Sequence, residues 1–381
     1  METVILPNPP STWDELTEEQ LIYIHTLLKE DLPESVYKMR VFLSLCGLEL
    51  CGKSFFTHED QLSVKDNLSV EELNIRLAWM EKVIRNEAPV TIVLKKKDDE
   101  ESPLMTISAE DFFYASEHFT KFLDEPFTLT DCHIDTIRIG SHTYKGPDPM
   151  LLSLTYEQFQ NAQTAASNVQ SSKDNMDMVH KKMLSELNKL SGENKNLSQE
   201  ELYLKLSPQL IRNIESCTKD LKDAQGEFIS SVLVPMEAVV METEVYDDDV
   251  NIKIDNEGNI VTKKEICWQT KKYDYHEMQR LKDEIADKAP DWLFPILYQW
   301  FQGSLLALQK KFPKLFSGKN SQDEYDPIKS FVQTLNTLMK EQGFPSQRAV
   351  LDADAILNFE TLNRLTIQAE EITRMRKKIK T

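Results

Sequence analysis

The segment from Gly47 to Ser54 carries the residue order of a nucleotide-binding P-loop, G-x-x-x-x-G-K-[ST]. A working P-loop follows a buried strand and opens a helix, because its backbone amides and the helix N-terminus hold the phosphates together. The residues before Gly47 instead place apolar side chains at helical spacing, from Val36 to Cys46. We therefore expect Gly47 to end a helix. A nucleotide-dependent enzyme using this segment is kept as an alternative.

Cys132, His133 and Asp135 form the one Cys/His/Asp cluster of the sequence. On a strand, His133 and Asp135 would share one face and Cys132 would point to the other, which weakens a three-ligand metal site. No second Cys or His pair stands at a zinc-like spacing, and no G-x-S-x-G or other hydrolase signature is present. We expect no metal, no cofactor and no catalytic activity.

The segment Trp292-Leu-Phe-Pro-Ile-Leu-Tyr-Gln-Trp-Phe-Gln-Gly-Ser-Leu-Leu-Ala-Leu308 concentrates aromatic and aliphatic side chains. As a helix it is apolar nearly all round, which is typical of a buried helix, here the centre of the C-terminal helical half. It is too short and too polar for a membrane span of roughly 20 apolar residues. The alternative is a surface that receives an apolar helix of a partner, because aromatic side chains dominate such anchors. The candidate partner-binding residues are Trp292, Phe294, Tyr298, Trp300, Phe301, Phe312 and Phe316.

The net charge limits the kinds of partner, and the cysteine usage indicates the cellular compartment. The chain has 44 Lys and Arg against 63 Asp and Glu, a net charge of −19. Such a surface repels nucleic acid and anionic lipid, so we expect neither as a partner. The first ten residues lack the pattern of a signal peptide, and the five cysteines are scattered. We therefore expect a cytoplasmic protein with reduced thiols.

Residues 1–146 are predicted to form an α+β domain. Capping patterns begin helices at Thr17 and Ser69, and Pro33 starts another helix between them. Alternating residues from Val90 to Ile107, interrupted by a charged turn, predict a β-hairpin. Two prolines and a glycine in Gly146-Pro-Asp-Pro149 then mark the domain boundary.

Residues 147–381 are predicted to form a mainly helical domain. Apolar residues recur at helical spacing from Thr155 to Leu190, as one long helix or as two helices broken near Lys173. A further helical stretch runs from Ser198 to Val234, and the pair favours an antiparallel helical hairpin. A β-hairpin is inserted at about residues 237–270, around an Asn/Gly turn. The fold class is thus α+β, mainly α-helical, and the short 3-4 repeat of the last helix leaves oligomerisation open.

Three segments together resemble proteins from the tail-gene modules of tailed bacteriophages and prophages of gut bacteria. They are Leu151–Phe159, Phe228–Pro235 and Trp300–Phe316. The resemblance implies a non-enzymatic role in virion assembly in the cytoplasm of the host, such as a tail-assembly chaperone that shields an apolar tape-measure helix. The partner would then be a tape-measure or other tail protein. A structural virion component is the alternative.

Overall fold

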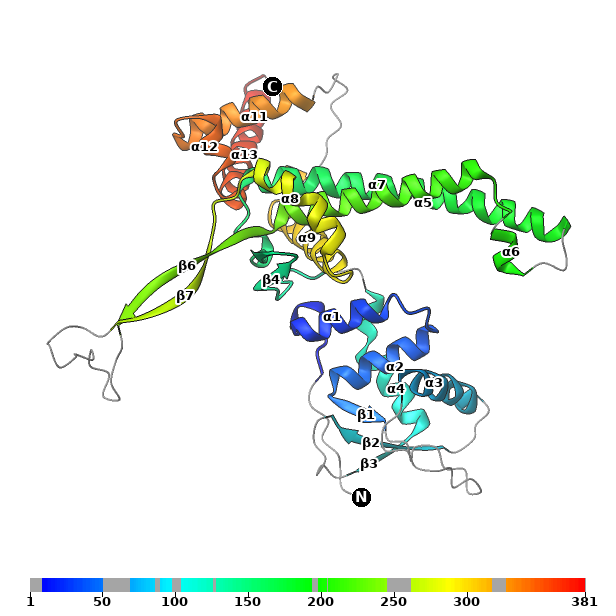
Figure 1. Ribbon diagram of the computed structural model, residues 1–381. Coiled ribbons are helices and arrows are strands. Elements are labelled where there is room, and N and C mark those ends of the chain that lie inside the picture. Colours follow the sequence, from blue (N-terminus) through cyan, green and yellow to red (C-terminus); the bar gives the residue numbers. More distant parts are fainter. Residues whose placement is uncertain are drawn as a thin grey trace. The chain divides into compact units, whose positions relative to one another are not determined.

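The chain divides into two compact units. Unit 1 comprises residues 1–133 and 291–307, and unit 2 comprises residues 134–290 and 308–381. This division differs from the predicted boundary at residues 146/147. The computed structural model (Figure 1) describes residues 9–50, 69–85, 90–97, 104–125, 128–193, 198–203, 205–244, 262–316 and 327–380.

Unit 1 combines short helices with a three-stranded antiparallel sheet. Its elements are η1 (Trp13–Glu15), α1 (Glu18–Leu27), α2 (Glu34–Leu45), β1 (Leu48–Leu50), α3 (Val70–Arg85), β2 (Thr91–Lys96), β3 (Met105–Ser108), α4 (Ala109–Phe119) and η2 (Lys121–Asp124). Helix α1 begins at the predicted capping box, in which Thr17 and Gln20 exchange hydrogen bonds between side chain and backbone. The predicted hairpin is confirmed, since Ile92 pairs with Ile107 across β2 and β3.

One apolar core joins the helices and the sheet of unit 1. Phe42 of α2 packs edge-on against Phe112 of α4, with ring centroids 5.6 Å apart. Leu77 of α3 and Ile92 of β2 are fully buried in the same cluster. The helical spacing of the apolar residues around Phe42 therefore marks the core face of α2, as the sequence predicts.

Lys38 is a buried cation held by three carboxylates. Its Nζ lies 3.1 Å from Glu34, 3.2 Å from Glu117 and 3.0 Å from Asp124. Burial by itself lowers the pKa of Lys38, but the hydrogen bonds to these carboxylates outweigh burial and raise the pKa above its usual range. The ammonium group thus ties α2 to α4 and η2.

Unit 2 contains an antiparallel sheet assembled from two hairpins that are distant in the sequence. The strands are β4 (Thr136–Ile139), β5 (His142–Lys145), β6 (Val234–Glu244) and β7 (Thr262–Thr270), in the order β4-β5-β6-β7. Gly140, with φ of 58°, makes the turn of the first hairpin. Tyr144 of β5 pairs with Pro235 of β6, so the first hairpin belongs to unit 2. This long-range pairing explains why the division falls before residue 134.

The helices of unit 2 include a long antiparallel hairpin (Figure 1). They are η3 (Pro149–Leu151), α5 (Tyr156–Glu193), α6 (Gln199–Tyr203), α7 (Pro208–Val232), α8 (Tyr275–Lys288), α10 (Pro313–Phe316), α11 (Pro327–Gln342), α12 (Gln347–Leu351) and α13 (Ala355–Lys380). Helix α5 is unbroken, and α7 returns along it. Asn168 bonds to Glu227 at one end of the pair, and Ser207 bonds to Glu186 towards the other.

Helix α9 (Leu293–Lys311) contributes residues 293–307 to unit 1 and its last residues to unit 2. The β6–β7 pair lies between α7 and α8 in the chain, as the predicted insertion does. The fold class is confirmed: the protein is mainly α-helical, with two small antiparallel sheets.

Candidate functional site

The aromatic segment proposed as a partner surface is largely buried. Trp300 and Phe301 are fully buried, and Phe294 and Phe312 are nearly so. Trp292, Tyr298 and Phe316 are half-buried. The four buried residues are therefore not available as surface anchors, and the interpretation as a core helix holds for most of the segment.

Helix α9 is a core helix of unit 1 and not of the C-terminal half. His25 Nε2 lies 2.8 Å from Gln299 Oε1, so the neutral imidazole of α1 donates a hydrogen bond to α9. Burial lowers the pKa of His25 to about 4, against the opposing influence of the bond to Gln299. A Cβ added at Gly303 would lie 2.2 Å from the carbonyl oxygen of Leu129, so only glycine allows this approach.

The two candidate residues that follow the segment, Phe312 and Phe316, belong to unit 2. Phe316 of α10 lies 6.2 Å from Phe359 of α13, measured between ring centroids. Phe359 also packs edge-on against Phe159 of α5, at 4.8 Å. Phe312 and Phe316 thus belong to a different unit from Trp300.

The Cys132–Asp135 cluster is a loop and not a strand. His133 adopts φ of 53°, and its backbone N–H donates to Asp131 Oδ1 at 2.9 Å. Cys132 is fully buried, whereas His133 is half-buried and Asp135 is exposed. Within the described ranges, no group of three or more His, Cys, Asp and Glu side chains is placed to hold a metal ion.

The P-loop-like segment is described only up to Leu50. Gly47 follows α2 with φ of 60°, which is the helix-ending conformation that the sequence predicts. A helix therefore precedes Gly47 where a P-loop has a strand. Residues 51–54, which complete the motif, lie outside the described residues.

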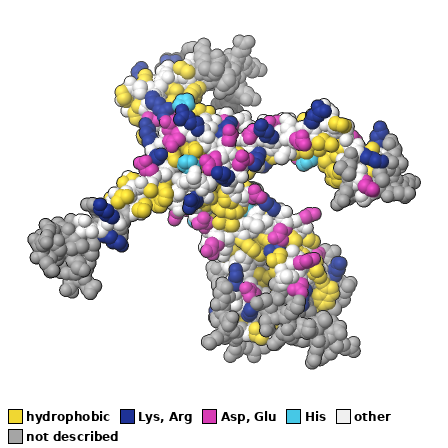
Figure 2. Space-filling model, viewed as in Figure 1, with side chains coloured by type: hydrophobic (Ala, Val, Ile, Leu, Met, Phe, Trp, Pro, Cys, Tyr) yellow, Lys and Arg dark blue, Asp and Glu magenta, His cyan; other side chains and the backbone are white. Residues whose placement is uncertain are grey.

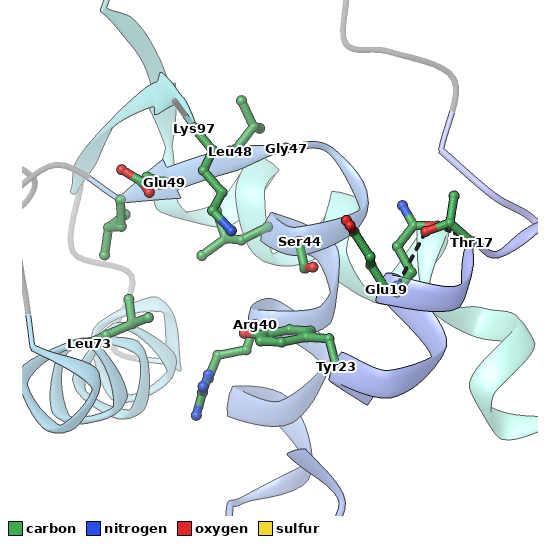
Figure 3. Close-up of a pocket in the computed structure, with 13 residues that line it drawn as sticks. Thr17, Glu19, Tyr23, Arg40, Ser44, Gly47, Leu48, Glu49, Leu73 and Lys97 are labelled. Atoms are coloured by element: carbon green, nitrogen blue, oxygen red, sulfur yellow. Dashed lines mark hydrogen bonds between the residues drawn. The ribbon is translucent and has the colours of Figure 1, made fainter. Parts of the chain in front are cut away.

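A cavity of about 870 Å³ in unit 1 is lined by charged residues of both signs, together with polar and apolar residues. Figure 3 shows the Tyr23 ring beside the side chain of Arg40, whose guanidinium carbon lies 5.9 Å from the ring centroid. Arg40 and Lys97 bring two positive charges to the wall, and Glu19 and Glu49 bring two negative charges. This balance favours neither an anion nor a cation, so the cavity points to no class of ligand.

The β6–β7 pair forms a two-stranded ribbon with apolar side chains on both faces. In its antiparallel register, Ala238 lies opposite Trp268 and Val240 lies opposite Ile266. Because side chains alternate along a strand, these four share one face, named here the Trp268 face. The opposite face, named the Met241 face, carries Val239, Met241 and Cys267.

The apolar side chains of the ribbon are exposed to solvent. On the Trp268 face the exposed fractions are 62% for Val240, 70% for Ile266 and 52% for Trp268. Met241 on the other face is 42% exposed. Figure 2 shows hydrophobic side chains gathered along the ribbon, with Lys or Arg side chains near its outer described end. Contiguous exposed apolar side chains mark binding surfaces.

The sequence contains the signal for the Trp268 face, although the sequence-based interpretation did not select it as a site. In the run Lys264-Glu-Ile-Cys-Trp-Gln-Thr270, Ile266 and Trp268 alternate with other residues at the spacing of a strand. The prediction placed the turn of the hairpin at residues 255–259, which lie outside the described residues. Exposure could not be predicted, because an alternating strand usually buries its apolar face.

Comparison with known proteins finds no matching family model, no matching curated protein and no matching solved structure. In the part of the chain that the structure describes, no helix is long and apolar enough to cross a membrane.

Proposed function

We propose that the protein is a non-enzymatic assembly protein that binds another protein through the β6–β7 ribbon. The observation that carries this proposal is the exposure of Val240, Ile266, Trp268 and Met241 on the two faces of one ribbon. An isolated two-stranded hairpin is marginally stable in water and gains stability when its apolar face is covered. A protein partner is the covering that fits an apolar surface on a chain of net charge −19.

The resemblance to tail-module proteins of bacteriophages supplies the class of partner. It supports a tape-measure or other tail protein as the ligand and the cytoplasm of the host as the place of assembly. In this proposal the ribbon shields an apolar segment of that tail protein before it enters the tail. The ribbon takes the role first assigned to the aromatic segment, whose main anchors are buried.

Co-expression with candidate tail proteins, a phage tape-measure protein first among them, tests the proposal. We expect the wild-type chain to co-purify with one of them, and the variant Met241→Glu to lose it, because a carboxylate on this face opposes apolar contact. The matched control is Tyr114→Ala in unit 1, which removes an exposed aromatic ring (72% exposed) far along the chain from the ribbon. Loss of the partner in both variants, or in neither, would contradict the proposal. Recovery of the chain in finished particles would assign it to the virion structure instead.

A further inference from the structure

Strand β7 is the last strand of its sheet, and no strand among the described residues pairs with its outer edge. The nine residue pairs between β6 and β7 follow one another without a bulge. One step before the first pair, the backbone N–H of Lys271 donates to the carbonyl oxygen of Pro235 at 2.9 Å. Hydrogen-bonded and non-hydrogen-bonded pairs alternate in an antiparallel ladder, so this bond determines which residues of β7 face β6 and which face away.

The even-numbered residues of β7 direct their backbone N–H and C=O groups away from β6. Because Lys271 bonds to β6, every second residue from it along β7 does the same, and the residues between them face outward. The outward-facing residues are Thr262, Lys264, Ile266, Trp268 and Thr270. The outer edge of β7 therefore presents a donor and an acceptor about every 7 Å.

An extended polypeptide is the ligand that matches this edge. Water bonds to these groups singly, but only another strand supplies acceptors and donors at the same interval. A helix bonds its own backbone groups and has none to offer along an edge. Among the described residues, β5 pairs with β6 only at Val234 and Pro235, so the ribbon beyond them has two strands. A third strand gives it the number at which sheets become stable.

The edge of β7 is more accessible to an added strand than the edge of β6. Strand β5 already occupies the edge of β6 at the base of the ribbon, whereas the edge of β7 is open along all nine pairs. The side chains of an added strand lie beside those of the strand that it joins. On β7 these neighbours include Ile266 and Trp268, which are 70% and 52% exposed. Pairing at β7 would thus cover both of them at the side.

The side chains of β7 differ between the two faces of the ribbon, and this difference defines the sequence pattern of the added strand. Ile266 and Trp268 lie on the Trp268 face, whereas Lys263, Cys267 and Gln269 lie on the Met241 face. Cross-strand neighbours stabilise a sheet when their chemistry matches, as aromatic and β-branched residues do. The matching strand carries apolar residues on the Trp268 face and polar residues on the Met241 face.

We propose that the outer edge of β7 binds an extended segment of the partner protein, as a fifth strand of the sheet β4-β5-β6-β7. Apolar and polar residues alternate in this segment, and the apolar ones continue the Trp268 face. The inference rests on the proposed function, because it takes the ribbon as the binding surface for a tail protein. A free segment of this pattern is prone to aggregate through its own edges, so pairing with β7 shields it.

The variants Ile266→Pro and Ile266→Ala distinguish edge pairing from contact with a face. Proline removes the outward N–H, and its ring occupies the space of the added strand. This N–H makes no bond to β6, so the ladder stays intact, as it does where proline lies on natural edge strands. Alanine removes most of the same side chain and keeps the N–H. We expect Ile266→Pro to bind a tape-measure protein at least about tenfold more weakly than Ile266→Ala.

Hydrogen exchange followed by NMR tests the edge with a defined probe. The probe is a peptide in which valine and threonine alternate over nine residues, the length of the register, with a lysine added at each end. The amide of Cys267 faces β6 and exchanges slowly, whereas those of Ile266 and Trp268 exchange fast. We expect excess peptide to slow exchange at Ile266 and Trp268 at least about tenfold and to leave Cys267 unchanged. The control peptide has proline at two adjacent central positions and should slow neither.

The outcomes separate edge pairing from the assembly function. Unchanged exchange at Ile266 and Trp268 in excess peptide overturns edge pairing. Slowing that rises with the concentration of the chain alone assigns the edge to a second copy and overturns it as well. A tail protein that binds equally to Ile266→Pro and Ile266→Ala but not to Met241→Glu removes edge pairing and keeps the assembly function. Slowing by the peptide in a chain that captures no tail protein keeps edge pairing and removes the assembly function.

Discussion

Unit 1 is expected to lose stability in mild acid through a single buried histidine. His25 is almost fully buried, and burial lowers its pKa in the folded state to about 4. In the unfolded chain the pKa of a histidine is about 6.5, so the unfolded state binds a proton first as the pH falls. The contribution of the neutral His25 side chain to the free energy of unfolding is complete above pH 6.5 and is lost progressively as the pH approaches 4.

The size of the loss follows from the two pKa values. When the pH falls from 7 to 5, the unfolded state binds a proton at His25 and the folded state does not. This difference lowers the free energy of unfolding by about 2 kcal/mol. Carboxylates and other histidines also titrate in this range, so the measured quantity is a difference between two proteins. The comparison is with His25→Gln, which does not titrate and keeps an N–H donor for Gln299.

Urea unfolding followed by tryptophan fluorescence is the suitable assay. Four of the five tryptophans belong to unit 1, so the signal reports mainly on that unit. We expect the wild-type free energy of unfolding to fall by about 2 kcal/mol more than that of His25→Gln when the pH drops from 7 to 5. Equal losses in the two proteins would show that His25 is not held neutral by burial, and the contact between α1 and α9 would need another explanation.

Two further predictions concern stability and use the same urea assay at pH 7. Gly303→Ala is expected to destabilise unit 1 by about 1–3 kcal/mol, because the new Cβ would lie 2.2 Å from the Leu129 carbonyl oxygen. Its control is Gly192→Ala on α5, where a new Cβ meets no atom within 4 Å; this residue belongs to unit 2, so the unfolding transition of unit 1 should stay unchanged. Lys38→Met is expected to cost about 1–2 kcal/mol, since it leaves three partly exposed carboxylates together without their cation. A neutral effect of Lys38→Met would contradict the role of this ammonium group as a tie between elements.

Local pattern predicts most elements, because each is determined by residues near one another in the chain. The capping box at Thr17 and the apolar spacing around Phe42 locate α1 and α2. The long-range pairing of Tyr144 with Pro235 leaves no local trace, since a strand carries the same alternation whichever strand it joins. The predicted boundary at Gly146 therefore separates a hairpin from the sheet to which it belongs.

The burial of α9 was predictable from sequence, but its place in the fold was not. Apolar residues on all sides of a helix predict a core position, and Trp300 and Phe301 occupy one. The pattern does not tell which core receives the helix. That assignment depends on partners distant in the sequence, such as His25 for Gln299, whose approach only the folded chain reveals.

Apolar content and availability for binding are therefore different properties in this chain. The most apolar segment stabilises the fold, because Trp300 and Phe301 are withdrawn from water. The ribbon is less apolar overall, yet Ile266 and Trp268 stay in solvent because no element among the described residues covers them with a second layer. Removing these side chains from water is favourable. Folding of the described chain leaves them exposed, so association with a partner can supply this stabilisation. A partner that supplies the missing layer stabilises the ribbon and itself in one step, which is what an assembly protein requires.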